Sequence, residues 1–69
     1  MREYLKDLRV RADMTQVELA ERLGIGRAYY TRIENGERQQ KMSISLAQKL
    51  SEIFDVPINY ILEQENQAS

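Results

Sequence analysis

The sequence contains no cysteine, no histidine and no tryptophan, and it has a single proline. Without cysteine the chain forms no disulfide and offers no thiolate to a metal ion. Without histidine it lacks the side chain that most often acts as a general base or binds a transition metal. In a chain of 69 residues these absences argue against an enzyme, and we expect neither a cofactor nor a bound metal.

Long apolar runs are also missing. No run approaches the roughly 18 residues of a transmembrane helix, and the first residues do not have the pattern of a secretory signal peptide. We therefore expect a cytoplasmic protein with no membrane partner.

The length allows one domain, which buries only about 60% of its unfolded surface. So small a domain is marginal alone and would gain stability by forming a homodimer.

The formal net charge is −1, but the charges are unevenly distributed. Residues 1–41 hold nine Lys/Arg and seven Asp/Glu, whereas residues 42–69 hold one and four. Within residues 22–41, five basic side chains accompany two acidic ones, Glu34 and Glu37. Positive charge concentrated in one stretch favours a local nucleic-acid-binding surface on a chain that is slightly acidic as a whole.

Residues 15–36 predict two short helices joined by a tight turn. Thr15 and Glu18 form a capping box at the start of the first helix, and Gly24 suits the C′ position at its end. A second helix is expected over residues 27–35. Helix, short glycine-containing turn and helix together form the helix-turn-helix pattern.

The apolar residues of this stretch predict how the two helices pack. The small Ala20 lets the second helix cross the first closely, and Ile25 in the turn is expected to be buried. Tyr30 and Ile33, three residues apart, form the inner face of the second helix. Tyr29 is expected to be exposed, the alternative being that both tyrosines belong to the core.

Three further helices complete an all-α fold. Residues 2–12 predict a first helix, and Ser43 is the expected N-cap of a fourth helix that ends near Phe54. Pro57 then opens a short fifth helix. The domain is expected to cover residues 1–63.

Residues 64–69 are expected to form a frayed polar tail.

The fifth helix carries three large apolar side chains, Ile58, Ile61 and Leu62, which cannot all face one small core. We therefore expect the helix to have an exposed apolar face. It would form a dimer interface from Tyr60, Ile61 and Leu62. Burial of these side chains against the first and fourth helices is the alternative.

The segment TQVELAERLGIGRAYYTRIENG resembles the core motif of the lambda-repressor/Cro-type (XRE-like) helix-turn-helix family of transcriptional regulators. The matching residues are Thr15, Gln16, Glu18, Leu19, Ala20, Leu23, Gly24, Arg32, Ile33, Glu34, Asn35 and Gly36. The resemblance covers roughly residues 4–62. It implies a five-helix lambda-repressor-like DNA-binding domain in which the second and third helices form the helix-turn-helix.

The resemblance and the residue types together assign the site. Base contacts are expected from Arg27, Ala28, Thr31 and Arg32, because arginine can bind guanine through two hydrogen bonds. Phosphate contacts are expected from Gln16, Tyr29, Asn35, Arg38 and Lys41. For Arg27 and Arg32 the alternative is contact with phosphate alone. The loop over residues 37–42 is longer than is common in the family and lacks the usual proline, so a mobile, solvated connection is its alternative.

The resemblance also implies a structural ion pair between Arg9 and Glu34, the alternative being a solvated arginine.

From the resemblance we expect a sequence-specific transcriptional regulator, most simply a repressor, with residues 27–35 in the major groove of double-stranded DNA. One such helix contacts too few base pairs to be selective, so a homodimer on an inverted-repeat operator is predicted. A regulatory protein partner is compatible with this prediction. The alternative function is a protein-interaction module such as an antitoxin or an anti-repressor target.

Overall fold

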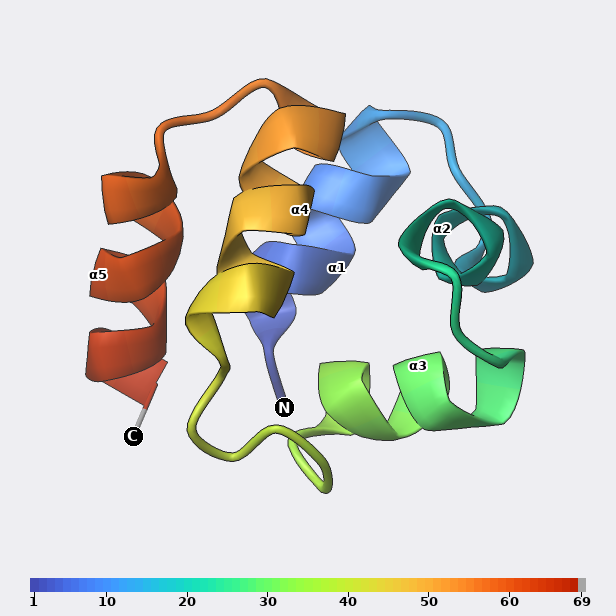
Figure 1. Ribbon diagram of the computed structural model, residues 1–69, viewed down its shortest axis with the longest axis horizontal. Coiled ribbons are helices and arrows are strands. Elements are labelled where there is room, and N and C mark those ends of the chain that lie inside the picture. The colour runs from blue at the N-terminus through green and yellow to red at the C-terminus, as the bar shows by residue number, and fades with distance from the viewer. Residues whose placement is uncertain (69) are drawn as a thin grey trace.

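The computed structural model describes residues 1–68, which form five α-helices and no strand. The helices are α1 (Glu3–Arg11), α2 (Gln16–Leu23), α3 (Arg27–Asn35), α4 (Ile44–Phe54) and α5 (Ile58–Ala68). α4 packs against α5, α2 packs against α3 and α4, and α1 packs against α3. α3 lies across one end of the other helices, next to α2 (Figure 1). The all-α, five-helix prediction is confirmed. No helix within residues 1–68 has both the length and the apolar character needed to cross a membrane.

Local capping interactions set where the helices begin and end. At the start of α2, the Thr15 Oγ1 accepts a hydrogen bond from the Glu18 backbone N–H at 3.1 Å, and the Glu18 carboxylate accepts one from the Thr15 N–H at 3.0 Å. Gly24 ends α2 at a φ of +73°, which glycine adopts without a Cβ penalty. Ser43 caps α4 by accepting from the Leu46 N–H at 3.2 Å. The predicted capping box, glycine C-cap and serine N-cap are confirmed.

All five helices contribute to the core. Its fully buried large apolar side chains are Leu5 of α1, Leu19 of α2, Tyr30 and Ile33 of α3, Leu50 of α4 and Ile61 of α5. Ala20 of α2 is buried as well, as expected. Each fully buried aliphatic side chain stabilises the fold by about 1.5–3 kcal/mol. A few residues therefore provide much of the stability of so short a chain.

The turn between α2 and α3 differs from the prediction in one respect. Ile25 is half-buried and packs against the edge of the core; it is not enclosed by it. Its backbone N–H donates to the Ala20 carbonyl at 3.0 Å, which holds the turn close to α2. The isoleucine side chain therefore remains partly open to solvent.

The predicted end of the fifth helix is corrected by the structure. α5 continues through Ala68, so residues 64–68 are not a frayed tail, whereas Ser69 lies outside the described residues. The reason is a long-range contact: the Glu65 carboxylate lies 2.7 Å from the Nε of Arg2. This ion pair fixes the second half of α5 although it carries few apolar side chains.

The predicted dimer interface on α5 also needs correction. Ile61 is fully buried in the core, so it cannot contact a second subunit. Ile58 and Leu62 are half-buried and pack against the same core, because α4 and α5 pack together closely enough to cover all three side chains. Tyr60, at 38% exposure, is the member of the predicted interface that is freely accessible.

This difference between neighbours on α5 can be tested by thermal unfolding. We expect Ile61→Ala to lower the free energy of unfolding by about 2–5 kcal/mol, because it leaves a cavity in the core. At a protein concentration low enough to keep the chain monomeric, Tyr60→Ala should change it by less than about 1 kcal/mol, as is usual for surface positions. Equal destabilisation by the two substitutions would contradict the assignment of Ile61 to the core of one chain.

Candidate nucleic-acid interface

α3 has one buried face and one accessible face. Its buried side chains are Tyr30, Ile33 and Glu34. Ala28, Arg32 and Asn35 are exposed and Thr31 is half-buried, and these four share one helical face because they are spaced i, i+3, i+4 and i+7. Arg27 is exposed at the first position of the helix. All four side chains expected to contact bases are thus accessible, and Asn35, expected to contact phosphate, lies on the same face.

Gln16, the first residue of α2, contacts this face directly. Its side-chain carbonyl oxygen accepts a hydrogen bond from the Thr31 hydroxyl at 3.2 Å. Gln16 is half-buried and still partly open to solvent beside the start of α2, where backbone N–H groups attract anions. The structure therefore joins two residues that the sequence assigned separately, one to a phosphate and one to a base.

A buried carboxylate fixes the inner side of α3. Glu34 is 1% exposed and accepts two hydrogen bonds from the Arg9 guanidinium, at 3.1 and 3.2 Å, so the ion pair expected between them is formed. The Tyr30 hydroxyl donates to the same carboxylate at 2.5 Å. Arg9 also donates to the Met14 carbonyl at 2.9 Å. The cluster thus joins α1, α3 and the segment that precedes α2.

The surroundings of Glu34 favour its charged form. Burial raises the pKa of Glu34, but the hydrogen bonds from Arg9 and Tyr30 and the positive charge of Arg9 outweigh burial, so its pKa lies below the ordinary range. Hydrogen bonding to Glu34 in turn raises the pKa of Arg9. Burial, followed by the bond to Glu34, raises the pKa of Tyr30. The cluster therefore holds a carboxylate, a guanidinium and a neutral phenol at neutral pH.

The loop over residues 37–42 carries two of the three other expected phosphate contacts, Arg38 and Lys41. The side chains of Arg38 and Lys41 are exposed. Between them, Gln39 has a φ of +54°, an uncommon conformation for a residue other than glycine. The Gln39 side chain donates to the Tyr29 hydroxyl at 3.0 Å and accepts from the Ser43 N–H at 3.1 Å. These two hydrogen bonds attach the loop to α3 and to the start of α4.

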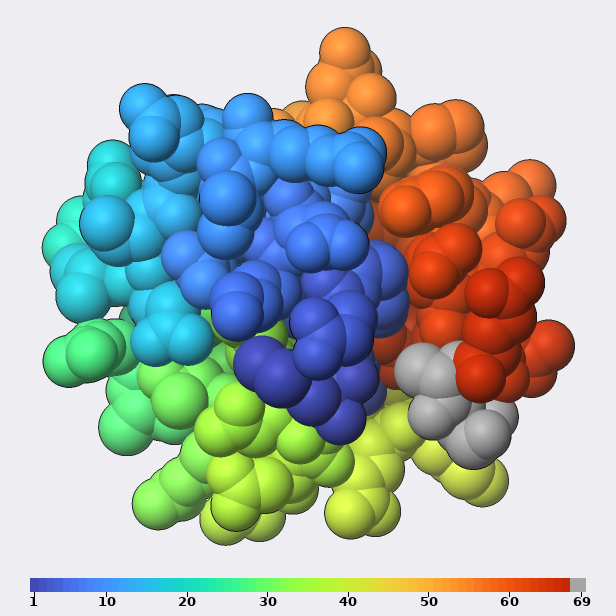
Figure 2. All heavy atoms as spheres, turned by 180° about the vertical axis from the view of Figure 1, so that it is seen from behind, coloured from blue at the N-terminus to red at the C-terminus, as the bar shows by residue number. Residues whose placement is uncertain are grey.

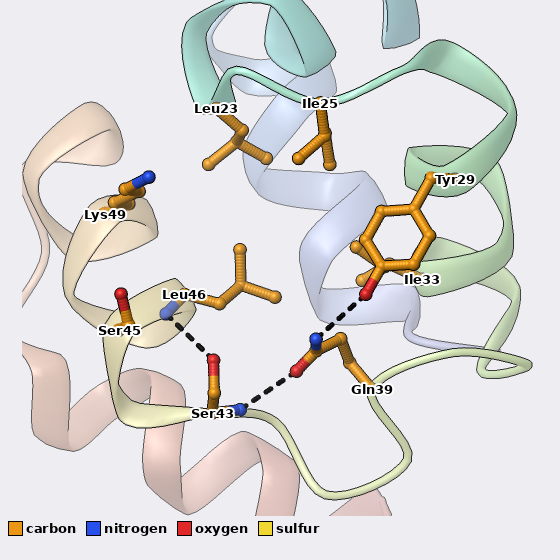
Figure 3. A pocket seen from close by; sticks show the side chains of 9 residues that line it. All are labelled: Leu23, Ile25, Tyr29, Ile33, Gln39, Ser43, Ser45, Leu46 and Lys49. Atoms are coloured by element: carbon orange, nitrogen blue, oxygen red, sulfur yellow. Dashed lines mark hydrogen bonds between the residues drawn. The ribbon is translucent and has the colours of Figure 1, made fainter.

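An open cavity of about 240 Å³ lies beside this attachment (Figure 3). Its apolar lining comes from Leu23, Ile25, Ile33 and Leu46, and its polar lining from Tyr29, Gln39, Ser43, Ser45 and Lys49. Gln39 spans the gap between Tyr29 and Ser43 at its edge (Figure 3). Tyr29 is accessible, as expected, but its ring faces this cavity and not the outer face of α3.

Sequence reasoning missed a second polar cluster, built on Arg2. Arg2 is 5% exposed and is bound to Glu65 of α5, whose carboxylate also accepts a hydrogen bond from the Tyr4 hydroxyl. Viewed from behind, the first residues of the chain lie next to α5 and directly above the end of α3 and the following loop (Figure 2). Arg2 and Glu65 are 63 positions apart, so no local pattern could have linked them.

The described residues contain no cluster suited to a metal ion. Within residues 1–68, no three acidic side chains come together to hold one. The groups with functional chemistry are instead the cations and hydrogen-bond donors of α3 and the following loop. Such groups bind phosphate oxygens and base edges.

Comparison with known proteins agrees with this geometry. The family model described as helix-turn-helix matches residues 5–61. The helix-turn-helix-type transcriptional regulator YqaF of Bacillus subtilis is 48% identical over 52 residues, covering 75% of this chain and 66% of YqaF. A helix-turn-helix-type transcriptional regulator of Archaeoglobus fulgidus is 34% identical over 67 residues, covering 94% and 92%. The cryptic phage CTXphi transcriptional repressor RstR of Vibrio cholerae is 35% identical over 54 residues, covering 78% and 47%.

The chain spans less than two-thirds of the length of several of these curated relatives, down to 17% for a transcriptional regulatory protein of Pyrococcus furiosus. No solved structure gives a significant match. The fold and the site define a small all-α domain built around a helix-turn-helix. The chain belongs to the XRE-type helix-turn-helix family of DNA-binding transcriptional regulators.

The charge state of Glu34 predicts how stability responds to acid. Because its pKa is lower in the folded chain, Glu34 stabilises the fold fully above its unfolded pKa of about 4.3. That contribution is lost as the pH falls through the folded pKa. We expect Glu34→Gln to lower the free energy of unfolding at neutral pH by about 1–3 kcal/mol. On acidification the variant should then lose less further stability than the wild type does. Urea unfolding between pH 7 and pH 3 measures both effects.

Glu37→Gln is the matched control, because the side chain of Glu37 is exposed. It should leave the pH dependence of the wild-type protein essentially unchanged. If Glu34→Gln showed the same acid-dependent loss as the wild type, the buried carboxylate would not be the group that links stability to pH.

Proposed function

We propose that this chain is a sequence-specific transcriptional regulator, most simply a repressor, that binds an inverted-repeat operator as a homodimer. α3 lies in the major groove, and Arg27, Ala28, Thr31 and Arg32 contact base edges. Gln16, Asn35, Arg38 and Lys41 contact phosphates. Tyr29 contacts a phosphate through its hydroxyl proton, because the hydroxyl oxygen accepts from Gln39 and leaves that proton free to be donated. The observation that carries the proposal is the division of α3 into a buried face fixed by Glu34 and an accessible face of groove-reading residue types.

The chemistry of the accessible face supports base reading. Arg27 and Arg32 are exposed and are not among the buried ion pairs of the structure, so their guanidinium groups are available to guanine O6 and N7. Each such pair discriminates against the wrong base by about 1–3 kcal/mol. Thr31 is oriented by Gln16, and Ala28 can pack against a thymine methyl group.

The dimeric part of the proposal follows from the small size of this face. A single recognition helix spans a few base pairs, which gives too little specificity among the competing sites of a genome. Two copies related by a two-fold axis read two half-sites about 10–10.5 base pairs apart, or a multiple of that spacing. On α5, Tyr60 is accessible and Leu62 partly so, and both remain as contacts to the second subunit. RstR, named as a repressor, supports repression as the simplest outcome.

Selection of binding sites from random duplex DNA tests the proposal. We expect the wild-type chain to enrich an inverted repeat. The double variant Arg27→Ala, Arg32→Ala should lose that enrichment or change the preferred bases, because the variant removes the two guanidinium groups that read guanine. Sequencing of the bound pool at fixed salt measures both outcomes.

The matched control is the double variant Lys6→Ala, Arg11→Ala, which removes the same charge from two exposed positions of α1. It should enrich the wild-type sequence, with weaker binding at most. If both double variants lost the enriched repeat equally, binding would depend on the positive charge of the chain and not on base contacts by Arg27 and Arg32. No enrichment by the wild type would favour a protein-interaction module, which pull-down of a partner would then test.

A further inference from the structure

Arg2 uses its whole guanidinium group inside the protein. Its Nε and one terminal nitrogen bind the two Glu65 carboxylate oxygens, at 2.7 and 3.0 Å. The terminal nitrogens also donate to three backbone carbonyls: that of Ile33, that of Arg38 at 3.1 Å, and that of Gln39. These five hydrogen bonds use all five donors of the side chain. At 5% exposure, Arg2 has no donor left for DNA and no path to it.

The carbonyls that Arg2 binds belong to the end of α3 and to the loop that follows it. The Gln39 backbone has a φ of +54°. A residue other than glycine keeps such a conformation where several surrounding interactions enforce it. Arg2 binds the Gln39 carbonyl, while the Gln39 side chain is held by Tyr29 and Ser43 (Figure 3). The two sets of bonds therefore fix the path of the loop between Arg38 and Lys41.

The bond to Glu65 makes α5 part of the same arrangement. Glu65 is held in turn by the Tyr4 hydroxyl, and the Tyr4 side chain is 8% exposed. A planar guanidinium that binds a carboxylate through two bonds is fixed in orientation as well as in position. Glu65 therefore determines the direction in which Arg2 presents its remaining donors to the loop.

We propose that Arg2 is a positioning residue for DNA binding: it holds the loop in the shape that presents Arg38 and Lys41 to the phosphate backbone, and Glu65 of α5 orients it. The proposal rests on the proposed function, since it assumes that these two cations contact phosphates. It goes beyond that function by assigning a DNA-binding role to a buried pair that cannot touch DNA. It also implies that displacement of the second half of α5 weakens DNA binding.

The salt dependence of binding tests the proposal on the DNA sequence obtained by selection. The logarithm of the binding constant falls with the logarithm of the salt concentration, with a slope of about −0.9 for each phosphate contact. We expect Arg2→Gln to make this slope shallower by about 0.9–1.8, which corresponds to one or two lost contacts. Affinity at 150 mM salt should fall about 5- to 30-fold on the same relation. The preferred base sequence should not change.

Four variants separate this effect from others. Arg38→Gln, Lys41→Gln defines the slope without the loop cations, and Arg2→Gln added to that variant should change the slope no further. Ile53→Ala, in a half-buried residue of α4, provides general destabilisation without touching the Arg2 bonds and should keep the wild-type slope. Glu65→Gln should act in the same direction as Arg2→Gln, but less strongly.

A folded Arg2→Gln protein with the wild-type slope overturns the proposal. If Arg2→Gln is unfolded at the assay temperature, the measurement is made with Glu65→Gln, and a wild-type slope there overturns it equally. Amide hydrogen exchange of the free protein gives a readout that needs no DNA. Exchange at Arg38 and Ser43, whose N–H groups are hydrogen-bonded, should be faster in Arg2→Gln than in Ile53→Ala; equal exchange in the two variants overturns the proposal.

The same measurements distinguish failure of this inference from failure of the proposed function. If the wild-type chain shows no specific, salt-dependent binding, the DNA-binding proposal fails whatever the exchange data show. If the wild-type chain binds specifically and only the Arg2→Gln effect is absent, Arg2 is a purely structural residue and the DNA-binding proposal stands.

Discussion

The carboxylate of Glu34 is the group on which the arrangement of this domain depends. It lies on α3, whose opposite face is accessible, yet it points inward and accepts hydrogen bonds from Arg9 and Tyr30. A buried charge of this kind adds little net stability, because desolvation offsets much of the attraction. What it provides is geometry: bonds to two partners fix how far α3 is rotated about its own axis. That rotation decides which side chains face outward.

Contacts with α2 and with the segment before it also hold α3 in place. Gln16 at the start of α2 binds Thr31, and Arg9 binds the carbonyl of Met14 just before α2. α3 is thus held on its buried face by the Arg9–Glu34–Tyr30 cluster and at its edge by the side-chain amide of Gln16. Arg27 and Arg32 therefore extend from a helix that is held at two places, and in the proposed complex with DNA such preorganisation reduces the entropy lost on binding.

Sequence patterns predicted those parts of the structure that are set by neighbouring residues. Both limits of α2 and the start of α4 follow from Thr15 with Glu18, from Gly24 and from Ser43, each acting within a few positions. The inner face of α3 follows from helical spacing. The role of Arg2, the continuation of α5 past residue 63 and the full burial of Ile61 depend on contacts between distant segments. A polar sequence such as QENQA gives no apolar periodicity from which such a helix could be inferred. The accessible positions on α3 agree with the prediction, while their contacts with DNA remain a prediction.

The two buried ion pairs also differ in the order in which a folding chain can make them. Arg9 and Glu34 are 25 positions apart, whereas Arg2 and Glu65 are 63 apart. Closing the longer loop costs about 0.8 kcal/mol more in chain entropy, from the logarithmic dependence on loop length. The pair that fixes α3 can therefore form once the first three helices have met, while the Arg2 pair requires nearly the whole chain to be in place. The Arg2 contacts that hold the loop after α3 therefore include one, to Glu65, that links the two ends of the chain.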